Sequence, residues 1–149
     1  MEPNVAATRR SAMVIQALSV RQPWAHAILC GGKTVENRSW PTQLRGTIAL
    51  HAGRSMEPED VAGFFKFIEE RALAGSWLQR GEVDNLPRGA VVGLVDIVDC
   101  VRNSPSPWFE GPYGFVLENP RPIMPIPCRG AQKFFDLPPD VLTALGLQK

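Results

Sequence analysis

Runs of apolar residues separated by turn residues indicate a chain built mainly from strands. Apolar and β-branched side chains predict a first strand over 13–20, and GTIALH at 46–51 is the clearest core strand. The longest β-rich run covers 90–101, where Gly93 is a candidate bulge. Two shorter strands are expected over 113–118 and 123–127. The second should be an edge strand, because prolines alternate with its apolar residues.

Three other stretches show helical spacing. Pro23 opens a short helix that stops at two glycines, and Gly31 is expected to be its left-handed cap. A longer amphipathic helix should follow Ser55 as its N-cap, with apolar residues three and four positions apart. Residues 137–147 indicate a short helix near the C-terminus.

Five or six strands with turns between them predict a small closed or nearly closed β-barrel, a mixed β fold with peripheral helices. A length of 149 residues suits one domain, which we expect to span 14–149 after a disordered tail over 1–13. The residues expected in the core are Ile48, Leu50, Phe64, Ile68, Val92, Leu94 and Phe115.

The composition narrows the classes of function. A formal net charge of +1 excludes a chain coated with positive charge, so any phosphate binding requires a local cluster of cations. The sequence has neither a run of about 20 apolar residues nor an apolar signal segment, and we expect a cytoplasmic protein that does not cross a membrane. Cys30, Cys100 and Cys128 lack metal-ligand spacing, and no nucleotide-binding motif is present. We therefore expect reduced thiols, no metal and no cofactor.

The stretch 33–39 departs from the pattern of a core strand. It places Lys33, Glu36 and Arg38 within six positions, and such residues are rarely buried unless they are paired. Glu36 and Arg38 share strand parity and should point to one face. We expect this strand to line a cleft with Arg21 beside it, and the preceding helix to form one wall. His51, at the end of a core strand, is a further candidate to face the cleft.

Residues 31–38 (GGKTVENR) match the GxKxxExR signature of the ASCH (activating signal cointegrator homology) domain family. The match is wider than this signature and covers roughly 15–135. It also includes LSVRQPWA at 18–25, RSW at 38–40, RG at 45–46, GLVD at 93–96 and DC at 99–100. The chain therefore resembles an ASCH domain over most of its length.

This resemblance implies a PUA-like β-barrel and an association with RNA or other nucleic acids. It favours a module that binds a single-stranded or flipped nucleotide, or a modified nucleotide, in a basic cleft. A protein-interaction domain is a further possibility. Some family members hydrolyse N4-acetylcytidine and one is described as a ribonuclease, so an enzyme using Lys33 is the alternative. In those hydrolases a threonine follows three residues after the lysine, where this chain has Glu36.

The candidate ligand-binding residues are Arg21, Gln22, Lys33, Glu36, Arg38, Trp40 and Arg45. Lys33 could contact a phosphate or, in an enzyme, act as the catalytic residue with Glu36, while Arg38 could hold a phosphate or a base edge. Trp40 and Trp108 could stack a base, whereas Trp24 is expected to be buried. In the structural alternative, the three charged residues form ion pairs that hold the turn and close the barrel.

Overall fold

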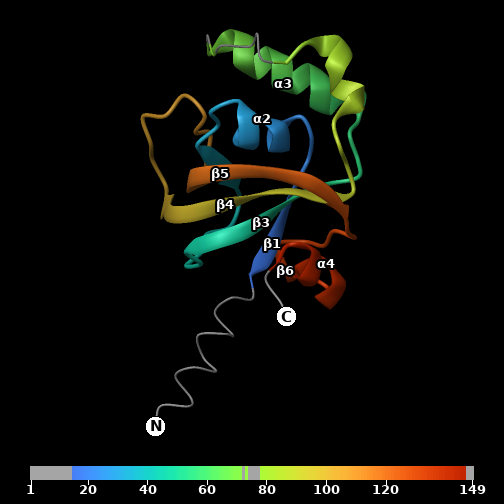
Figure 1. Ribbon diagram of the computed structural model, residues 1–149. Helices are drawn as coiled ribbons and strands as arrows, with labels where there is room; N and C mark the ends of the chain where they lie inside the picture. The colour runs from blue at the N-terminus through green and yellow to red at the C-terminus, as the bar shows by residue number, and fades with distance from the viewer. Residues whose placement is uncertain (1–14, 72, 74–77, 147–149) are drawn as a thin grey trace.

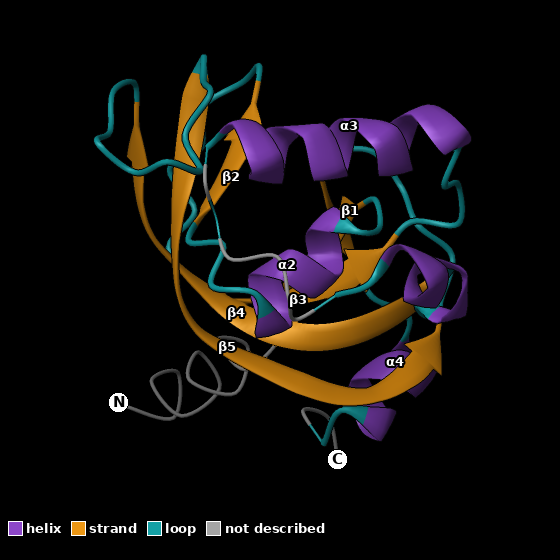
Figure 2. Cartoon of the chain, turned by 90° about the horizontal axis from the view of Figure 1, so that it is seen from above, coloured by secondary structure: helices purple, strands orange, loops and turns teal. Residues whose placement is uncertain are grey.

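The computed structural model describes residues 15–71, 73 and 78–146. In this part of the chain a six-stranded sheet curls into a half-barrel, with helices against both of its faces (Figures 1 and 2). The strands are β1 (Gln16–Val20), β2 (Val35–Arg38), β3 (Gly46–Ala52), β4 (Ala90–Val101), β5 (Tyr113–Pro127) and β6 (Phe134–Asp136). The helices are α2 (Trp24–Cys30), α3 (Pro58–Glu70), the 3-10 helix η1 (Arg80–Asn85) and α4 (Pro139–Ala144). This curled sheet confirms the expected PUA-like small barrel.

The sheet has the strand order β2-β5-β4-β3-β1-β6. All neighbouring pairs are antiparallel except β1 and β3, which run parallel. The register between β4 and β5 shifts at three places, one of them next to Gly93, as expected for a bulge. Such irregularities bend a strand and increase its twist, which helps this sheet to curl.

The core is divided into layers by α2, which lies between the sheet and α3 (Figure 2). The concave side of the sheet packs against Ala25 and Ile28 of α2. On the other side of α2, the Trp24 ring meets Phe64 and Phe67 of α3 edge-on, with centroids 4.9 and 5.2 Å apart. A third cluster joins the outer face of the sheet to α4.

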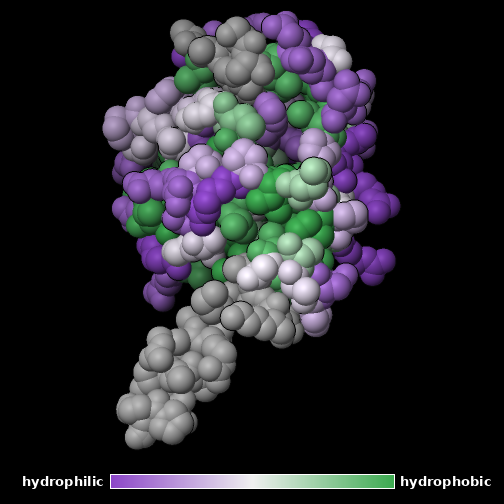
Figure 3. Space-filling model, viewed as in Figure 1, coloured by the Kyte–Doolittle hydropathy of each residue, from purple (hydrophilic) through white to green (hydrophobic). Residues whose placement is uncertain are grey.

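The residues expected in the core are buried, except Leu94. Leu94 is half-buried because it alternates along β4 with the buried Val95 and so belongs to the outer cluster. On the face shown in Figure 3, apolar side chains gather over the strands in the middle of the molecule, and hydrophilic ones surround them. Within the described ranges, no helix is long and apolar enough to cross a membrane.

Several element boundaries differ from the sequence-based expectations. Gly31 has a φ of −112°, and Gly32, at +76°, adopts the left-handed conformation instead. The N-cap of α3 is Glu57, not Ser55, and its backbone N–H donates to the Asp60 carboxylate at 2.7 Å. The two strands expected over 113–127 form one continuous strand, and β6 was not predicted. The expected tail and residues 13–14 lie outside the described part of the chain.

The half-barrel has a gap between its two edge strands, β2 and β6. Across the described residues these strands are not paired, and the Trp40 ring packs edge-on against both Phe115 and Phe134, with centroids 5.2 and 5.5 Å away. Arg38 of β2 donates to the Ser19 carbonyl of β1 at 2.8 Å. Side chains therefore join the two sides of the gap, and the charged end of β2 comes next to the end of β1.

Candidate functional site

A pocket of about 450 Å³ lies where the end of β1 approaches β2 and α3. Sites for small ligands commonly occupy 300–1,000 Å³. Lys33, Glu36 and Arg38 line it together with Arg21 and Trp24. The residues expected to share a cleft are thus close together, while their binding of a ligand stays a prediction.

Glu36 connects the two cations of this group. Its Oε1 lies 3.1 Å from Lys33 Nζ, and its Oε2 accepts from Arg38 Nε at 2.9 Å. Glu36 and Arg38 project to one side of β2 as their parity requires, and the turn at Gly32 brings Lys33 back beside them. The Lys33 and Glu36 side chains are only 3% and 10% exposed. One buried carboxylate therefore faces two cations. Lys33, Glu36 and Arg38, the charged trio, together keep one positive charge.

The Lys33 ammonium group is largely committed to the protein. It donates to Glu36 and to the Val35 carbonyl, which accounts for two of its three hydrogens. Its Nζ also lies 5.8 Å from the centroid of the Trp24 ring, within the range of a cation–π contact. These contacts fix Lys33 at the pocket and leave one hydrogen for another acceptor.

Arg38 is held at two of its three nitrogens. Its Nε donates to Glu36 and its Nη2 to the Ser19 carbonyl, whereas Nη1 has no hydrogen-bond partner among the described residues. The side chain is 21% exposed and lines the pocket. A planar guanidinium with free donors is suited to phosphate and carboxylate oxygens.

The pocket has mixed charge. Arg21 is 57% exposed and lies 3.2 Å from Asp60, the residue that also caps α3. Glu110 lines the pocket from the loop before β5 and pairs at 3.6 Å with Arg71, the residue that follows the end of α3. The lining residues thus include three cations and two carboxylates, a formal excess of one positive charge.

Three of the candidate residues lie outside this pocket. Gln22 is buried, where its amide donates to the Pro87 carbonyl and accepts from the backbone of His26, both at 2.9 Å. Trp40 packs against Phe115 of β5 and Phe134 of β6. Arg45 lies before β3, at the opposite end of that strand from the pocket, and donates to nearby backbone carbonyls. Gln22 and Trp40 make contacts within the fold and Arg45 is exposed to solvent, so we omit these three residues from the site.

The tryptophans also differ from expectation. Trp108 was a candidate for stacking a base, but it is buried and stacks on Phe67 with a centroid distance of 5.9 Å. Trp24 is only half-buried and lines the pocket. Helical spacing alone could not show whether Trp24 is buried or lines the pocket. The helix α2 is covered on two sides, so apolar spacing does not indicate which face of it borders the pocket.

Asn37 belongs to the pocket although no pattern in the sequence indicated it. Its Oδ1 accepts from the backbone of Glu110 at 2.7 Å and of Gly111 at 3.0 Å, and its Nδ2 donates to the Trp108 carbonyl at 3.0 Å. Asn37 thereby holds the proline-rich loop beside the pocket. These partners lie more than 70 positions away in the sequence, so no local pattern could reveal them.

Nothing in the described ranges suggests a metal centre, since no three His, Cys, Asp or Glu side chains are grouped to hold an ion. His51 does not reach this pocket. It lies in a second pocket, which shares only Ser19 with the first. The three cysteines are unpaired, as expected.

Comparison with known proteins adds evidence from the sequence. Residues 18–118 match the family model of the ASCH domain. Over 130 residues the chain is 30% identical to activating signal cointegrator 1 of Homo sapiens and 29% identical to activating signal cointegrator 1 of Mus musculus. Each alignment covers 80% of this chain and 22% of the relative. The chain therefore spans about a fifth of the length of the curated relatives that it matches.

Proposed function

Because the chain belongs to the ASCH domain family, we propose that the pocket beside Lys33, Glu36 and Arg38 binds a nucleotide of single-stranded RNA. One observation carries this proposal: the Arg38 side chain lines a pocket of suitable volume and is fixed there by Glu36 and Ser19, while its Nη1 has no hydrogen-bond partner among the described residues. Arginine at such a position recognises phosphate oxygens or the edge of an unpaired base.

The low net charge of the chain favours RNA binding through a few local contacts, not through non-specific electrostatic attraction. The overall formal charge is +1, so non-specific attraction to nucleic acid is weak. The positive excess in the pocket comes from residues already positioned by hydrogen bonds. We therefore expect an affinity that depends on a few contacts and a shallow salt dependence.

An enzyme acting on a modified nucleoside, or a ribonuclease, is the alternative function for the same pocket. It would require Lys33 to act on the substrate. The ammonium group donates instead to Glu36 and Val35, and Glu36 stands where the hydrolases have a threonine. These contacts favour binding over hydrolysis as the first function to test.

The proposal can be tested with fluorescein-labelled octaribonucleotides, read by fluorescence anisotropy between about 50 and 200 mM salt. Arg38→Ala should weaken binding about tenfold, as for the loss of one charge-assisted contact worth roughly 1.5 kcal/mol. Where the contact is to a phosphate, the slope of log K against log salt should also fall by about 0.7. Arg45→Ala removes the same charge outside the pocket and should leave both quantities unchanged.

Equal affinity of Arg38→Ala and wild type, with melting temperatures within a few degrees, would overturn the proposal. The alternative is tested in parallel by incubating the protein with N4-acetylcytidine and with the unlabelled octamer. Turnover by wild type that disappears in Lys33→Arg would establish an enzyme, since the variant keeps the charge but not the amine.

A further inference from the structure

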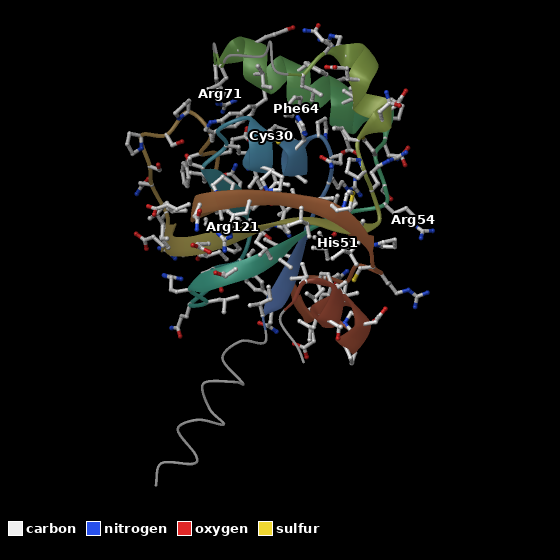
Figure 4. The ribbon with its side chains drawn as sticks, viewed as in Figure 1. Cys30, His51, Arg54, Phe64, Arg71 and Arg121 are labelled. Carbon is white, nitrogen blue, oxygen red and sulfur yellow. The ribbon has the colours of Figure 1, made fainter. Side chains whose placement is uncertain are left out.

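A second pocket, of about 620 Å³, lies at the end of the sheet where β1 and β3 end and β4 begins. Ser19 lines both pockets: its hydroxyl bonds His51 of the second pocket, and its carbonyl accepts from Arg38 of the first. His51 and Arg54 lie at this end of the molecule, away from Arg121 (Figure 4). Among the described residues, its lining includes Arg54 and Arg129 and contains no carboxylate. This pocket is therefore more positive than the first one.

The base of this pocket is a closed network of hydrogen bonds. His51 Nε2 lies 2.7 Å from the Cys128 carbonyl, which can only accept, so Nε2 carries the hydrogen. In the neutral ring, Nδ1 then accepts from the Ser19 hydroxyl at 2.9 Å. Burial lowers the pKa of His51, and the hydrogen bond to Cys128 opposes this only in part, so the ring is neutral near pH 7. The network fixes the segment before Arg129 to β1 and β3.

Glycines allow the backbone to approach this network. A Cβ at Gly130 would lie 2.7 Å from His51 Cε1, and one at Gly53 would lie 3.4 Å from Ser19 Oγ. Any side chain at Gly130 would therefore have to displace the imidazole. Arg54 and Arg129 are adjacent in sequence to these two glycines, and both are exposed. The backbone thus holds two exposed cations at the opening of a pocket with a rigid base.

We propose that this second pocket holds the phosphate group next to the nucleotide in the first pocket, so that an RNA strand crosses Ser19. The proposal rests on the proposed function and extends it. Two arginines without an opposing carboxylate in the described lining favour an anion of the phosphodiester class. Because Ser19 borders both pockets, one short strand that passes over this residue would contact both. The preferred ligand is then an oligonucleotide, because a free nucleoside lacks the phosphate that the second pocket would hold.

The test uses the full chain and the labelled octaribonucleotide. The double variant Arg54→Ala with Arg129→Ala should weaken binding by at least about fivefold and lower the salt slope by about 0.7, as for one lost phosphate on a single strand. Replacing the same two arginines by lysine should restore most of the salt slope. A matched control, Arg45→Ala with Arg102→Ala, removes two exposed arginines outside both pockets and should change affinity less than about twofold.

The outcomes separate the two proposals. If Arg38→Ala weakens binding but the Arg54 and Arg129 pair does not, the second pocket is not part of the RNA site and the proposed function stands. An equal loss in the matched control would also overturn the inference, because it would indicate a general charge effect. If wild type does not bind the octamer, both proposals fail. Inorganic phosphate that shifts the amide NMR signals of Gly53, Gly89 and Gly130 in wild type, but not in the double variant, would support the anion pocket directly.

Discussion

Glu36 is the residue on which the geometry of the first pocket depends, because its two oxygens hold Lys33 and Arg38 apart and in place. A buried ion pair contributes little net stability, since desolvation offsets the attraction between the charges. Removing one member is different, because the remaining charge is then buried without a partner. The charged trio therefore affects both the stability of the fold and the positions of the cations in the pocket.

Glu36→Gln tests this link. The substitution keeps the size of the side chain but leaves the Lys33 ammonium, 3% exposed, without its counter-charge. We expect the free energy of unfolding to fall by about 3 kcal/mol in urea denaturation. Asp60→Asn is the control, because its partner Arg21 is 57% exposed and the amide can still accept the capping hydrogen bond. It should cost less than about 1 kcal/mol, and equal losses in the two variants would contradict the prediction.

At this scale the sequence predicted the trio but not its surroundings. Strand parity was enough to place Glu36 and Arg38 on one face, and the structural alternative of paired charges matches the observed contacts. Gln22 could not be assigned in the same way, because its amide is bound by Pro87, 65 positions away. A polar side chain next to a ligand motif looks the same in sequence whether it faces a ligand or a buried carbonyl.

Among the elements, α2 packs closely against the sheet. It crosses β4 at Gly93, where a Cβ would lie 2.5 Å from Leu29 Cδ2 and 2.8 Å from the Arg121 carbonyl. The leucine can move, but the backbone of β5 cannot move without disturbing the sheet. Gly93 is therefore required by the close approach of three elements.

Two Gly→Ala substitutions should have opposite effects. Gly93→Ala should lower the free energy of unfolding by about 1–3 kcal/mol through overpacking. Gly63 lies within α3, and a Cβ there would meet no described atom within 4 Å beyond its own stretch of helix. Gly63→Ala should therefore raise stability by about 0.5–1 kcal/mol through helix propensity. Chemical denaturation of both variants gives the comparison. A neutral or stabilising Gly93→Ala would show that α2 is not seated on the sheet as described.

The strands also show which element bounds the hydrophobic pattern of the sequence can predict and which it cannot. The bounds of β4 agree with the expected run over 90–101, because apolar and β-branched residues fill most of it. The prolines of β5 suggested a break, yet the strand continues. Beyond Val116, β5 pairs with β4 on one side and has no β2 partner on the other in the described sheet. Prolines there lack a backbone N–H, but on the unpaired side no hydrogen bond between strands is lost. β6 has three residues and exists only through its pairing with β1, which no local pattern encodes.

For the whole molecule, the position of α2 couples the sheet to the α3 layer. Ala25 and Ile28 belong to the cluster against the sheet, and Ala27 belongs to the cluster against α3. The short helix therefore cannot keep its environment if either layer separates. This coupling favours one cooperative unit, and a single domain over 14–149 stays a prediction.

Phe64→Ala tests this coupling, since Phe64 of α3 is fully buried and packs edge-on against Trp24 of α2. The truncation should cost about 3–5 kcal/mol. In wild type and variant alike, unfolding curves from far-UV circular dichroism and from tryptophan fluorescence should coincide, as in a two-state transition. Separate midpoints for the two signals would mean that the α3 layer unfolds on its own.

The bridge from Arg38 to the Ser19 carbonyl also has an entropic consequence. A free arginine side chain carries about 2 kcal/mol of rotamer entropy, most of which is lost when its position is fixed. In this chain the loss occurs during folding, since Glu36 and Ser19 hold the guanidinium before any ligand arrives. An anion entering the pocket meets donors that are already oriented, whereas at Arg54 or Arg129 it must order a solvent-exposed side chain. In the proposed RNA site, the first pocket would thus be preorganised, whereas the second would have to adapt to its ligand.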